Sequence, residues 1–525
     1  MASKTLTKYK NELMQEILQS DLHGKRVYLI GSAEFGPTNE PLLIKSTVGL
    51  YNKFGRYGTL IDAFHALKYV DKNNEVYLVK TTGEHAKCFL NVNIFGGDCI
   101  KDGFIIAASE SNEIYNDVSV MIDIDGITIS FPDAFNLDDK TYLYKDYPTI
   151  ERLATAINEE TASRKNKLYA YYTVDPGIRT ETAFFSCNQT MNYMYGGYCG
   201  LNYSKNMLYN CLARTYDMLE SEDIDIIIPV DACLDDIYPN DSEELEYQYD
   251  MKYYHSTKDY LTQDVNGNYR SYLNQLINFC VRQLNFGVVT HGIIGFNKMY
   301  TNDFLYEADD VSKMLKACLE WNVYHVQDKF HTFLISATCG DIKYNYGTII
   351  ANSCYAYAAL MASIKITEGT TNIPVNNISL YTEFSEEVLP ELADAGLVAF
   401  RQSPLYEAPV VYAGITLSVN DENLRLLVNV RMCQLAISYL NKLYQFYIGQ
   451  NLNELIDNGT INTDSNTILR TILSRNIINN YTLKLKPDYS NGTLMVYLTM
   501  QTNYMTKDIT ISTQINSEFS EQANG

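Results

Sequence analysis

The sequence has a shortage of basic residues and no long apolar run, and each of these two features excludes a class of function. Its 525 residues include one tryptophan, and 41 lysines and arginines stand against 63 aspartates and glutamates, a formal net charge of −22. Nucleic acid presents closely spaced phosphates, so an acidic chain with no basic cluster longer than 163–167 is not expected to bind it. A bilayer-spanning helix needs about eighteen apolar residues in a row, and since no such run occurs we expect no membrane insertion.

The sequence also lacks a secretion signal and a pattern of paired cysteines. Residues 1–21 have no uninterrupted apolar stretch and instead predict a short amphipathic helix, so we expect synthesis in a cytoplasm. Eleven cysteines are scattered singly, without any C-x-x-C, which indicates reduced thiols. Cys187, Cys199 and Cys211 recur every twelve residues, but a zinc site usually includes a close ligand pair. We therefore expect no metal and no cofactor.

Motifs for catalysis are incomplete. Gly31–Gly36 resembles half of a phosphate-binding loop, but Pro37 follows where that loop requires Gly-Lys-Ser/Thr. Carboxylates past a predicted buried strand, with two histidines elsewhere, leave open an α/β-fold hydrolase or transferase. These residues are Asp231, Asp235, Asp236, His255 and His291. No G-x-S-x-G nucleophile motif accompanies them, and His325 and His331 lack the i, i+4 spacing of helical zinc ligands. We expect no catalytic residues and no enzyme.

Tyrosine is what the sequence has in abundance. The chain holds 44 tyrosines, many of them clustered, as in 169–172, 193–198 and 247–254. Tyrosine is enriched at protein interfaces, because its ring buries a large area and keeps one polar handle. A coding bias toward tyrosine, asparagine, isoleucine and lysine explains the same count, so both interpretations stay open.

Hydrophobic periodicity divides the chain into segments. Strands at Val27–Ile30 and Glu75–Lys80 with a helix at Leu60–Val70 predict an α/β start, and alternating strands from 91 predict a β-rich insertion. Buried strands and helices then alternate, which predicts a mostly parallel sheet. The predicted segments are an N-terminal arm 1–24, core 25–90, insertion 91–175, α/β domain 176–371, C-terminal domain 372–505 and C-terminal arm 506–525.

Within these segments we predict four elements that matter below. Thr348–Ile364 predicts one long apolar helix, and Asn423–Gly449 predicts one amphipathic helix. Tyr481–Lys486 and Thr493–Thr502 predict a terminal pair of strands.

Two blocks of the sequence carry a resemblance to a known family. The first is 27–58, VYLIGSAEFGPTNEPLLIKSTVGLYNKFGRYG. The second runs from Gly396-Leu-Val-Ala-Phe-Arg401 through Val411–Thr416 to Val428-Asn-Val-Arg-Met432, where the family pattern has a second arginine in place of Met432. In this order the motifs resemble contractile tail sheath proteins of myovirus-type bacteriophages and related contractile injection systems.

The resemblance implies a fold and a function. It implies a multidomain α/β and α+β fold with a subtilisin-like core, an inserted β-rich domain, an α+β C-terminal sheath domain and extended terminal arms. It also implies a structural subunit of the virion, made in the host bacterial cytoplasm. Such subunits stack as hexameric helical rings around a tail tube protein, join baseplate and tail terminator proteins, and contract to drive the tube through the bacterial envelope. A static, non-contractile shell protein is the alternative.

The resemblance also suggests which residues carry the function. Arms of this family add strands to neighbouring subunits, and the candidates here are Lys4–Ser20 and Thr506–Ile515. The apolar arm residues are Leu6, Leu13, Ile17, Ile509, Ile511 and Ile515. Relatives place the C-terminal domain innermost, which makes Arg425, Arg431 and Lys442 candidates to face the tube. Ordinary flexible termini, and the solvated face of a helix, are the alternatives for these two sets.

Overall fold

The chain divides into two compact units. Unit 1 comprises Met1–Leu18 and Gly449–Gly525, and unit 2 comprises Gln19–Ile448. The computed structural model describes residues 2–19, 24–94, 98–135, 137–162, 167–185, 190–201, 203, 205–234, 271–296, 328, 330–344, 347–419, 421–490 and 492–502. The sequence also predicts a helix at 311–321, a surface excursion at 235–268 and a strand at 508–515, and all three lie outside these residues.

A seven-stranded sheet forms the centre of unit 2. Its strands follow the order β17-β13-β12-β11-β1-β3-β2, and all neighbours are parallel except β2, which runs antiparallel to β3. The bounds are β1 Arg26–Gly31, β2 Leu42–Ile44, β3 Glu75–Lys80, β11 Ile226–Pro229, β12 His291–Gly295, β13 Ile335–Thr338 and β17 Leu397–Val398. The central strands are apolar on both sides, as expected for strands covered on both faces.

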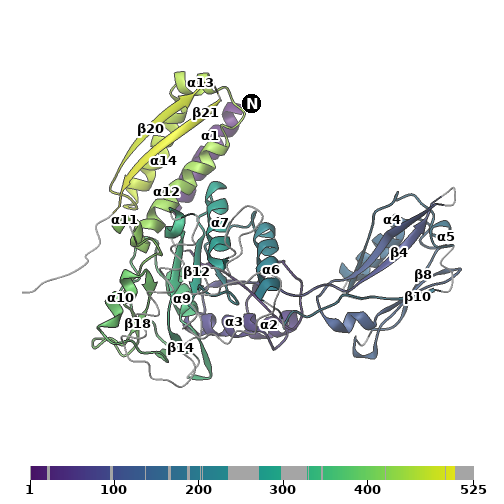
Figure 1. Cartoon of the computed structure of the whole chain (residues 1–525). Helices are drawn as coiled ribbons and strands as arrows, with labels where there is room; N and C mark the ends of the chain where they lie inside the picture. The colour runs from purple at the N-terminus through teal and green to yellow at the C-terminus, as the bar shows by residue number, and fades with distance from the viewer. Residues whose placement is uncertain are drawn as a thin grey trace, which may run out of the picture. The chain divides into compact units, whose positions relative to one another are not determined.

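Helices cover both faces of this sheet (Figure 1). One core joins Val27 and Leu29 of β1 to α3 (Thr59–Val70) and α9 (Cys354–Ser363). The other joins Tyr28 and Ile30 to α6 (Lys205–Met218), α7 (Tyr272–Asn285) and α10 (Val388–Asp394). Alternate residues of one strand thus feed two hydrophobic cores. This mixed, multi-sheet α/β architecture agrees with the predicted fold class, whereas the subtilisin-like topology stays a prediction.

The stretch between β3 and α6 contains two antiparallel sheets and a core of its own. One sheet pairs β4 (Lys87–Asn93), β5 (Cys99–Ala108) and β9 (Leu168–Tyr172). The other has the order β10-β6-β7-β8, with bounds Thr190–Tyr193, Ser119–Ile122, Gly126–Ser130 and Lys140–Leu143. Helices α4 (Ile150–Ala162) and α5 (Thr180–Ala183) complete it. Side chains such as Phe104, Tyr142 and Leu153 are fully buried there, so this β-rich segment has a core separate from those of the central sheet.

A buried lysine lies where this β-rich segment leaves the sheet. Lys80 ends β3, its side chain is fully buried, and its ammonium donates to the carbonyl oxygen of Ser111 at 3.1 Å. Burial lowers the pKa of Lys80 to about 8, and Glu110 and Glu113 oppose that shift. The contact ties the loop after β5 to the end of β3.

The segment after β13 differs from the prediction in two places. The predicted helix Thr348–Ile364 is wrong over its first residues, because β15 (Ile349–Asn352) pairs with β14 (Asp341–Tyr344). Asn352 Oδ1 then accepts from the backbone N–H of Cys354 at 2.9 Å, where α9 begins. β14 also pairs with β16 (Ile378–Leu380), and β18 (Phe400–Arg401) pairs with β19 (Val410–Val411).

The predicted helix Asn423–Gly449 is interrupted at Leu426. It forms a short α11 (Glu422–Arg425) and a longer α12 (Leu427–Gln445). Leu426 is extended, with φ −78° and ψ 115°, and forms a bridge with Ile415. The backbone N–H of Thr416 donates to the carbonyl of Arg425 at 2.8 Å. This pairing holds the chain extended between the two helices.

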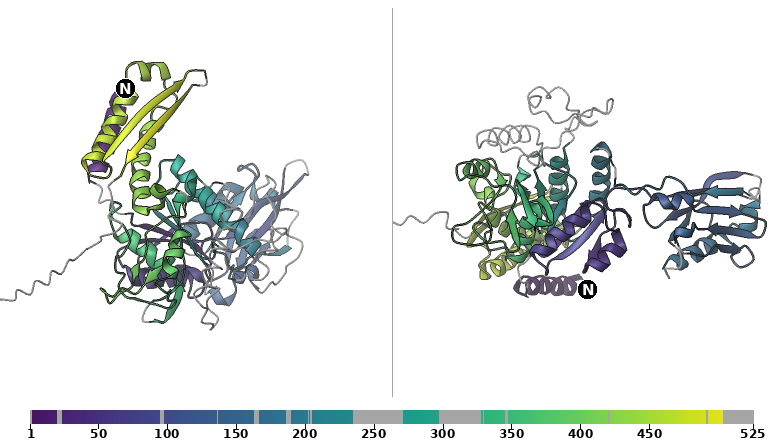
Figure 2. Two further views of the ribbon diagram at one scale, coloured as in Figure 1. Left: turned by 60° about the vertical axis from the view of Figure 1, so that its left-hand side comes forward. Right: turned by 90° about the horizontal axis from the view of Figure 1, so that it is seen from below.

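Unit 1 joins the two ends of the chain. Its elements are α1 (Ala2–Gln19), α13 (Leu452–Asp457), α14 (Thr460–Ser474), β20 (Asn480–Asp488) and β21 (Thr493–Gln501). β20 and β21 form the predicted terminal strand pair, and Figures 1 and 2 show them side by side against α14. Residues 372–448, which we assigned to the C-terminal domain, cluster instead with unit 2.

Candidate assembly surface

The β20–β21 hairpin has two open edges. Its strands pair over nine residues each, from Asn480 opposite Gln501 to Asp488 opposite Thr493, and no third described strand joins them. In a two-stranded ribbon, each strand turns about half of its N–H and C=O groups away from its partner. Both edges of this hairpin can therefore accept a further strand.

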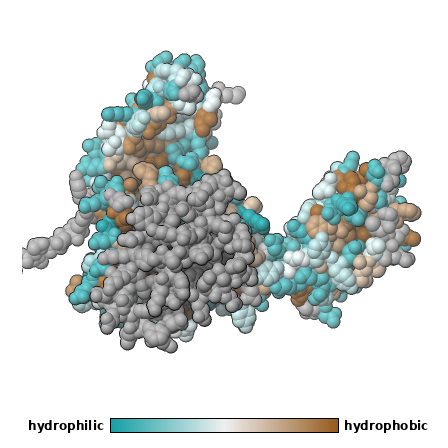
Figure 3. Space-filling view, viewed as in Figure 1, coloured by the Kyte–Doolittle hydropathy of each residue, from teal (hydrophilic) through white to brown (hydrophobic). Residues whose placement is uncertain are grey.

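The inner face of the hairpin is apolar and only partly covered. Cross-strand pairs such as Leu483 with Leu498 and Leu485 with Val496 lie on one face, and all of these side chains are half-buried. Tyr481 contacts α14 through a hydrogen bond from its hydroxyl to Asn466 Oδ1 at 3.0 Å. A two-stranded hairpin is only marginally stable alone. Because the side chains on this face are only half-buried, they have apolar area left to bury against another partner. Figure 3 shows apolar side chains among hydrophilic ones on the surface of the chain.

The N-terminal segment is a helix packed within unit 1. The Lys10 ammonium donates to the Asp464 carboxylate at 2.6 Å, and the Asp464 side chain is only 6% exposed. The Arg475 guanidinium donates to the carbonyl of Ile17 at 2.7 Å and to that of Leu18. A cation at a helix C-terminus stabilises it, because the last carbonyls carry partial negative charge. These contacts hold the middle and the C-terminal end of α1 to the segment 464–475.

The arm residues fall into three groups. Leu13 and Ile17 are buried, on one face of a helix, whereas we predicted an arm that donates an extended strand. The side chain of Leu6 lies outside the described residues, as do Ile509, Ile511 and Ile515. Strand donation by either arm therefore stays a prediction.

The three residues expected to face a tube lie in different surroundings. Arg425 donates to the carbonyl of Ala393 at 2.6 Å and to Asp394 at 2.9 Å. Lys442 lies over the ring of Tyr439, 5.2 Å from its centre. Both remain candidates for such a contact.

Arg431 does not present a charge at the surface. It is 5% exposed and donates to the carbonyl of Met361 at 3.1 Å. Burial lowers its pKa to about 10. An outward-facing Arg431 is therefore the wrong assignment for the chain as it is folded.

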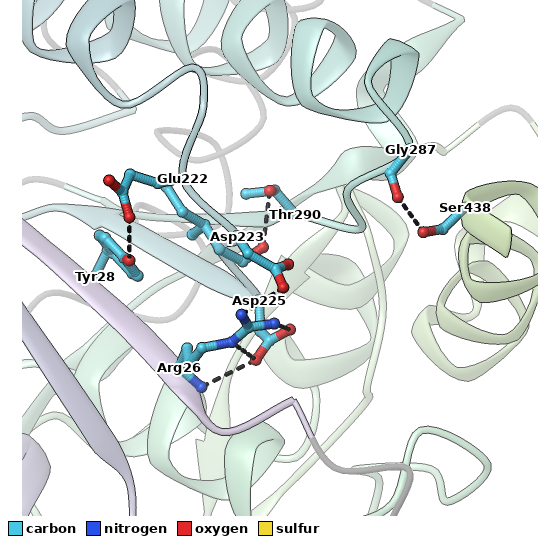
Figure 4. Close-up of polar contacts among 9 residues, drawn as sticks. Arg26, Tyr28, Glu222, Asp223, Asp225, Gly287, Thr290 and Ser438 are labelled. Carbon is cyan, nitrogen blue, oxygen red and sulfur yellow. Dashed lines mark hydrogen bonds and ion pairs between the residues drawn. The ribbon is translucent and has the colours of Figure 1, made fainter. Parts of the chain in front are cut away.

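Polar contacts hold α12 at the amino-terminal edge of the sheet (Figure 4). Arg26, which begins β1, contacts Asp223 at 2.6 Å and Asp225 at 3.1 Å, just before β11. Burial raises the pKa of Asp225, and the Arg26 guanidinium opposes that shift. In the same region the Ser438 hydroxyl of α12 donates to the carbonyl of Gly287. These groups fix loops and a helix and do not form a reactive pair.

The opposite edge of the sheet carries the remaining enzyme candidate. Asp231 follows β11, where burial raises its pKa to about 6 against hydrogen bonds from Thr59, Tyr203 and Ser32. The carboxyl ends of parallel strands are where α/β enzymes bind ligands. His291, however, begins β12, at the amino-terminal edge, and a strand of four residues spans about 13 Å. Asp231 and His291 therefore do not form the acid–base pair that the sequence left open.

The histidines have structural partners. His291 Nε2 lies 2.9 Å from the Ser336 hydroxyl, which donates to the carbonyl of Ile415 at 2.8 Å. Burial lowers the pKa of His291 to about 3, so it is neutral. His331 Nδ1 lies 2.5 Å from Asp328. His255, His325, Asp235 and Asp236 lie outside the described residues.

Across the described ranges, no group of three or more histidine, cysteine, aspartate or glutamate side chains is arranged to hold a metal. In the same part of the chain, no helix has the length and apolarity needed to cross a bilayer. A cavity of about 440 Å³ lies near the amino-terminal edge, bordered by Lys25, Asp71 and Asn74, and thus away from Asp231.

The sequence did not reveal the contacts within unit 1. Lys10 and Asp464 are 454 residues apart, and nothing in either local pattern links them. The alternation of 480–501 was sufficient to predict two strands, and it also places Lys484 and Lys486 on the outer face. The alternation of polar and apolar residues is therefore a signal from which this outer face can be found in the sequence.

Comparisons with known proteins give structural likeness only. No protein-family model matches the sequence, and no curated protein matches it. Among solved structures, a sheath tail protein from Listeria innocua is 11% identical with a TM-score of 0.47, over 95% of this chain and 99% of that one. A sheath tail protein from Desulfitobacterium hafniense is 11% identical with a TM-score of 0.45, over 92% and 98%.

A chain of the anti-feeding prophage baseplate in the contracted state is also similar. It is 10% identical with a TM-score of 0.48, over 95% of each chain. The structures that this chain is similar to are thus phage-type sheath tail proteins and sheaths of contractile injection systems, at low sequence identity.

Proposed function

We propose that the chain is a structural subunit of a contractile tail sheath, not an enzyme. The observation that carries the proposal is the β20–β21 hairpin, a nine-residue ribbon with two open edges and a half-covered apolar face. Monomeric proteins usually protect such edges, because an exposed edge recruits other strands. The succession of motifs in 27–58 and 396–432 resembles that of sheath proteins and supports a sheath as the kind of assembly that the hairpin joins.

The open edges supply the linkage between copies. A strand from the arm 506–515 of one copy pairs with the hairpin of the next, through main-chain hydrogen bonds that make little demand on side-chain identity. Such a contact joins different surfaces, so it propagates as rings or helices instead of closing as a dimer. Stacked hexameric rings around a tail tube, bounded by baseplate and terminator proteins, are the assembly that we propose.

The N-terminal helix gives the second arm a route from a folded to an exchanged state. An isolated 18-residue helix is only marginally stable in water. Loss of the Lys10–Asp464 and Arg475 contacts therefore frees residues 2–19 to extend toward a neighbour. Contraction then re-packs subunits that stay tethered by their arms, and this drives the tube through a bacterial envelope.

Deletion of the C-terminal arm tests the proposal. The purified full chain should form hollow striated tubes by negative-stain microscopy. A chain lacking 503–525 should stay folded by circular dichroism and sediment as monomer, because the hairpin has lost its incoming strand. Deletion of 517–525 alone is the matched control and should leave tubes intact. Tubes of normal yield from the 503–525 deletion would contradict strand exchange through this arm.

The same images separate the alternatives. Tubes that shorten and widen on triggering support a contractile sheath, whereas shells of one fixed length support a static virion protein. The hydrolase alternative rests on Asp231 at the carboxyl edge of the sheet. Turnover by discrete monomers, abolished by Asp231→Asn, would favour that alternative.

A further inference from the structure

The outer face of the β20–β21 hairpin carries a compact basic and apolar block. Lys484 lies directly opposite Tyr497, and Lys486 directly opposite Met495. All four side chains are exposed, Tyr497 and Met495 by 52% and 50%. Among the described residues neither lysine forms an ion pair. We refer to these four residues as the basic block.

Charge is distributed unequally between the two units. Unit 1 contains 8 basic and 9 acidic residues, whereas unit 2 contains 33 basic and 54 acidic residues. Copies that pack together through unit 2 alone therefore repel one another. A contact that places the lysines of one copy on carboxylates of the next relieves part of that repulsion.

Unit 2 presents an acidic and apolar surface of matching composition. Exposed carboxylates of Glu383, Glu386 and Glu387 precede α10, and the loop between β18 and β19 exposes Leu405 by 84% and Tyr406 by 46%. The Arg401 guanidinium of β18 contacts Glu386 at 3.3 Å, which joins the two segments and leaves Glu386 70% exposed. We refer to Glu383, Glu386, Glu387, Leu405 and Tyr406 as the acidic ridge. An exposed apolar pair on a segment that an ion pair joins to exposed carboxylates has the mixed character of an interaction site.

We propose that the basic block of one copy docks on the acidic ridge of a second copy. This inference rests on the proposed function, since it needs a polymer of the chain. Tyr497 and Met495 then pack against Leu405 and Tyr406, and the two lysines pair with the glutamates of the acidic ridge. The apolar centre supplies most of the affinity, while the charges select the partner and speed association. The two surfaces differ, so the contact is head-to-tail and propagates.

Charge reversal in the full chain tests the docking. Lys484→Glu with Lys486→Glu places like charges together, and we expect the critical concentration for polymer, measured by sedimentation, to rise at least about tenfold. Lys45→Glu with Lys53→Glu, two exposed lysines of unit 2, applies the same change of charge elsewhere and serves as the control. Reversal of the ridge by Glu383→Lys with Glu387→Lys should restore polymer when combined with the reversed block.

The outcomes separate this inference from the proposed function. If the unmodified chain forms no polymer at any concentration, both fail. If the unmodified and the block-reversed chains polymerise alike, while the 503–525 deletion does not, only the docking is wrong. A loss of polymer in the lysine control equal to that in the block reversal also overturns the docking, because net charge alone then explains the effect.

Cross-linking gives a second measurement that does not depend on variants. A zero-length carbodiimide reagent should join Lys484 or Lys486 to Glu383, Glu386 or Glu387 in polymer. With a mixture of ¹⁵N-labelled and unlabelled chains, the cross-linked peptides should carry one heavy and one light partner. Cross-links of these lysines confined to single chains, or to other carboxylates, would contradict the docking.

Discussion

The central sheet of unit 2 and the hairpin of unit 1 use the same kind of strand in opposite ways. β1 has neighbours on both sides, and its Leu29 is fully buried. β20 has one neighbour, and its Leu485 is half-buried. β1 therefore pairs with strands of its own chain along both edges. β20 pairs along one edge only, so its other edge and part of its apolar area are left for another partner. Burial of strand edges thus distinguishes the central sheet of unit 2, which we call the scaffold, from the hairpin of unit 1, which we call the connector.

Matched leucine truncations give the largest expected effect. Leu29→Ala should lower the free energy of unfolding by about 2–5 kcal/mol, because it leaves a cavity among fully buried neighbours. Leu485→Ala should cost less than about 1.5 kcal/mol in the free subunit, since its side chain is already partly exposed. Denaturant unfolding of soluble subunit measures both. Equal losses would mean that the hairpin is as self-sufficient as the sheet.

The ion pair that holds α1 gives the next effect. Lys10→Met leaves the Asp464 carboxylate buried without its cation, and we expect a loss of about 1–3 kcal/mol in the protection of residues 2–19. Lys8→Met is the matched control, because Lys8 and Glu12 are 78% and 60% exposed and such pairs contribute little. Hydrogen exchange read by mass spectrometry compares the two. Unchanged protection in Lys10→Met would show that α1 is held by its apolar face alone.

The pKa of Asp231 predicts a pH dependence of the scaffold. Burial raises it to about 6 in the folded chain, against about 3.9 for an unfolded aspartate. Between these values the folded chain binds a proton that the unfolded chain does not, so stability falls as pH rises from about 4 to about 6. The loss, fully present above about pH 6, should amount to about 1–3 kcal/mol.

Asp231→Asn should flatten this profile, as measured by thermal unfolding across the same pH range. Asp138→Asn, an exposed aspartate of the β-rich segment, should leave it unchanged. A profile that keeps its slope without the Asp231 carboxyl would assign the dependence to other groups.

The smallest effect concerns Arg425. Its side chain is 26% exposed, and it contacts Asp394, which is 78% exposed. Arg425→Ala should change the stability of the free subunit by less than about 1 kcal/mol. If Arg425 faces a tube, the same substitution should weaken co-sedimentation with tube protein. A larger effect on the free subunit would instead make it a structural residue.

Local pattern was sufficient for much of the fold. Apolar runs predicted the strands β1 and β3, and alternation predicted β20 and β21, because the hydrophobic pattern of a strand is a property of a single segment. The misassigned start of Thr348–Ile364 also had a local signal, since Asn352 is a favoured residue at a helix start.

Other features depended on distant residues. Leu426 is extended because Ile415 pairs with it, and Arg431 is buried because α9 supplies the Met361 carbonyl. A helix pattern assigns charged residues to the solvent, so it cannot anticipate a buried guanidinium. Of the candidate site, the strands of the hairpin were predicted, whereas the partners of α1 were not.

The pairing of α1 with α14 also sets an order of events during synthesis. Lys10 leaves the ribosome long before Asp464, which lies 454 residues later. At about 5–20 residues per second, α1 waits roughly 20–90 seconds before its partner is translated. Unit 2 can fold in that interval, before the contacts of α1 with Asp464 and Arg475 are able to form. A nascent subunit is therefore unable to complete unit 1 until residues 464–475 have been translated, which is after the whole of unit 2.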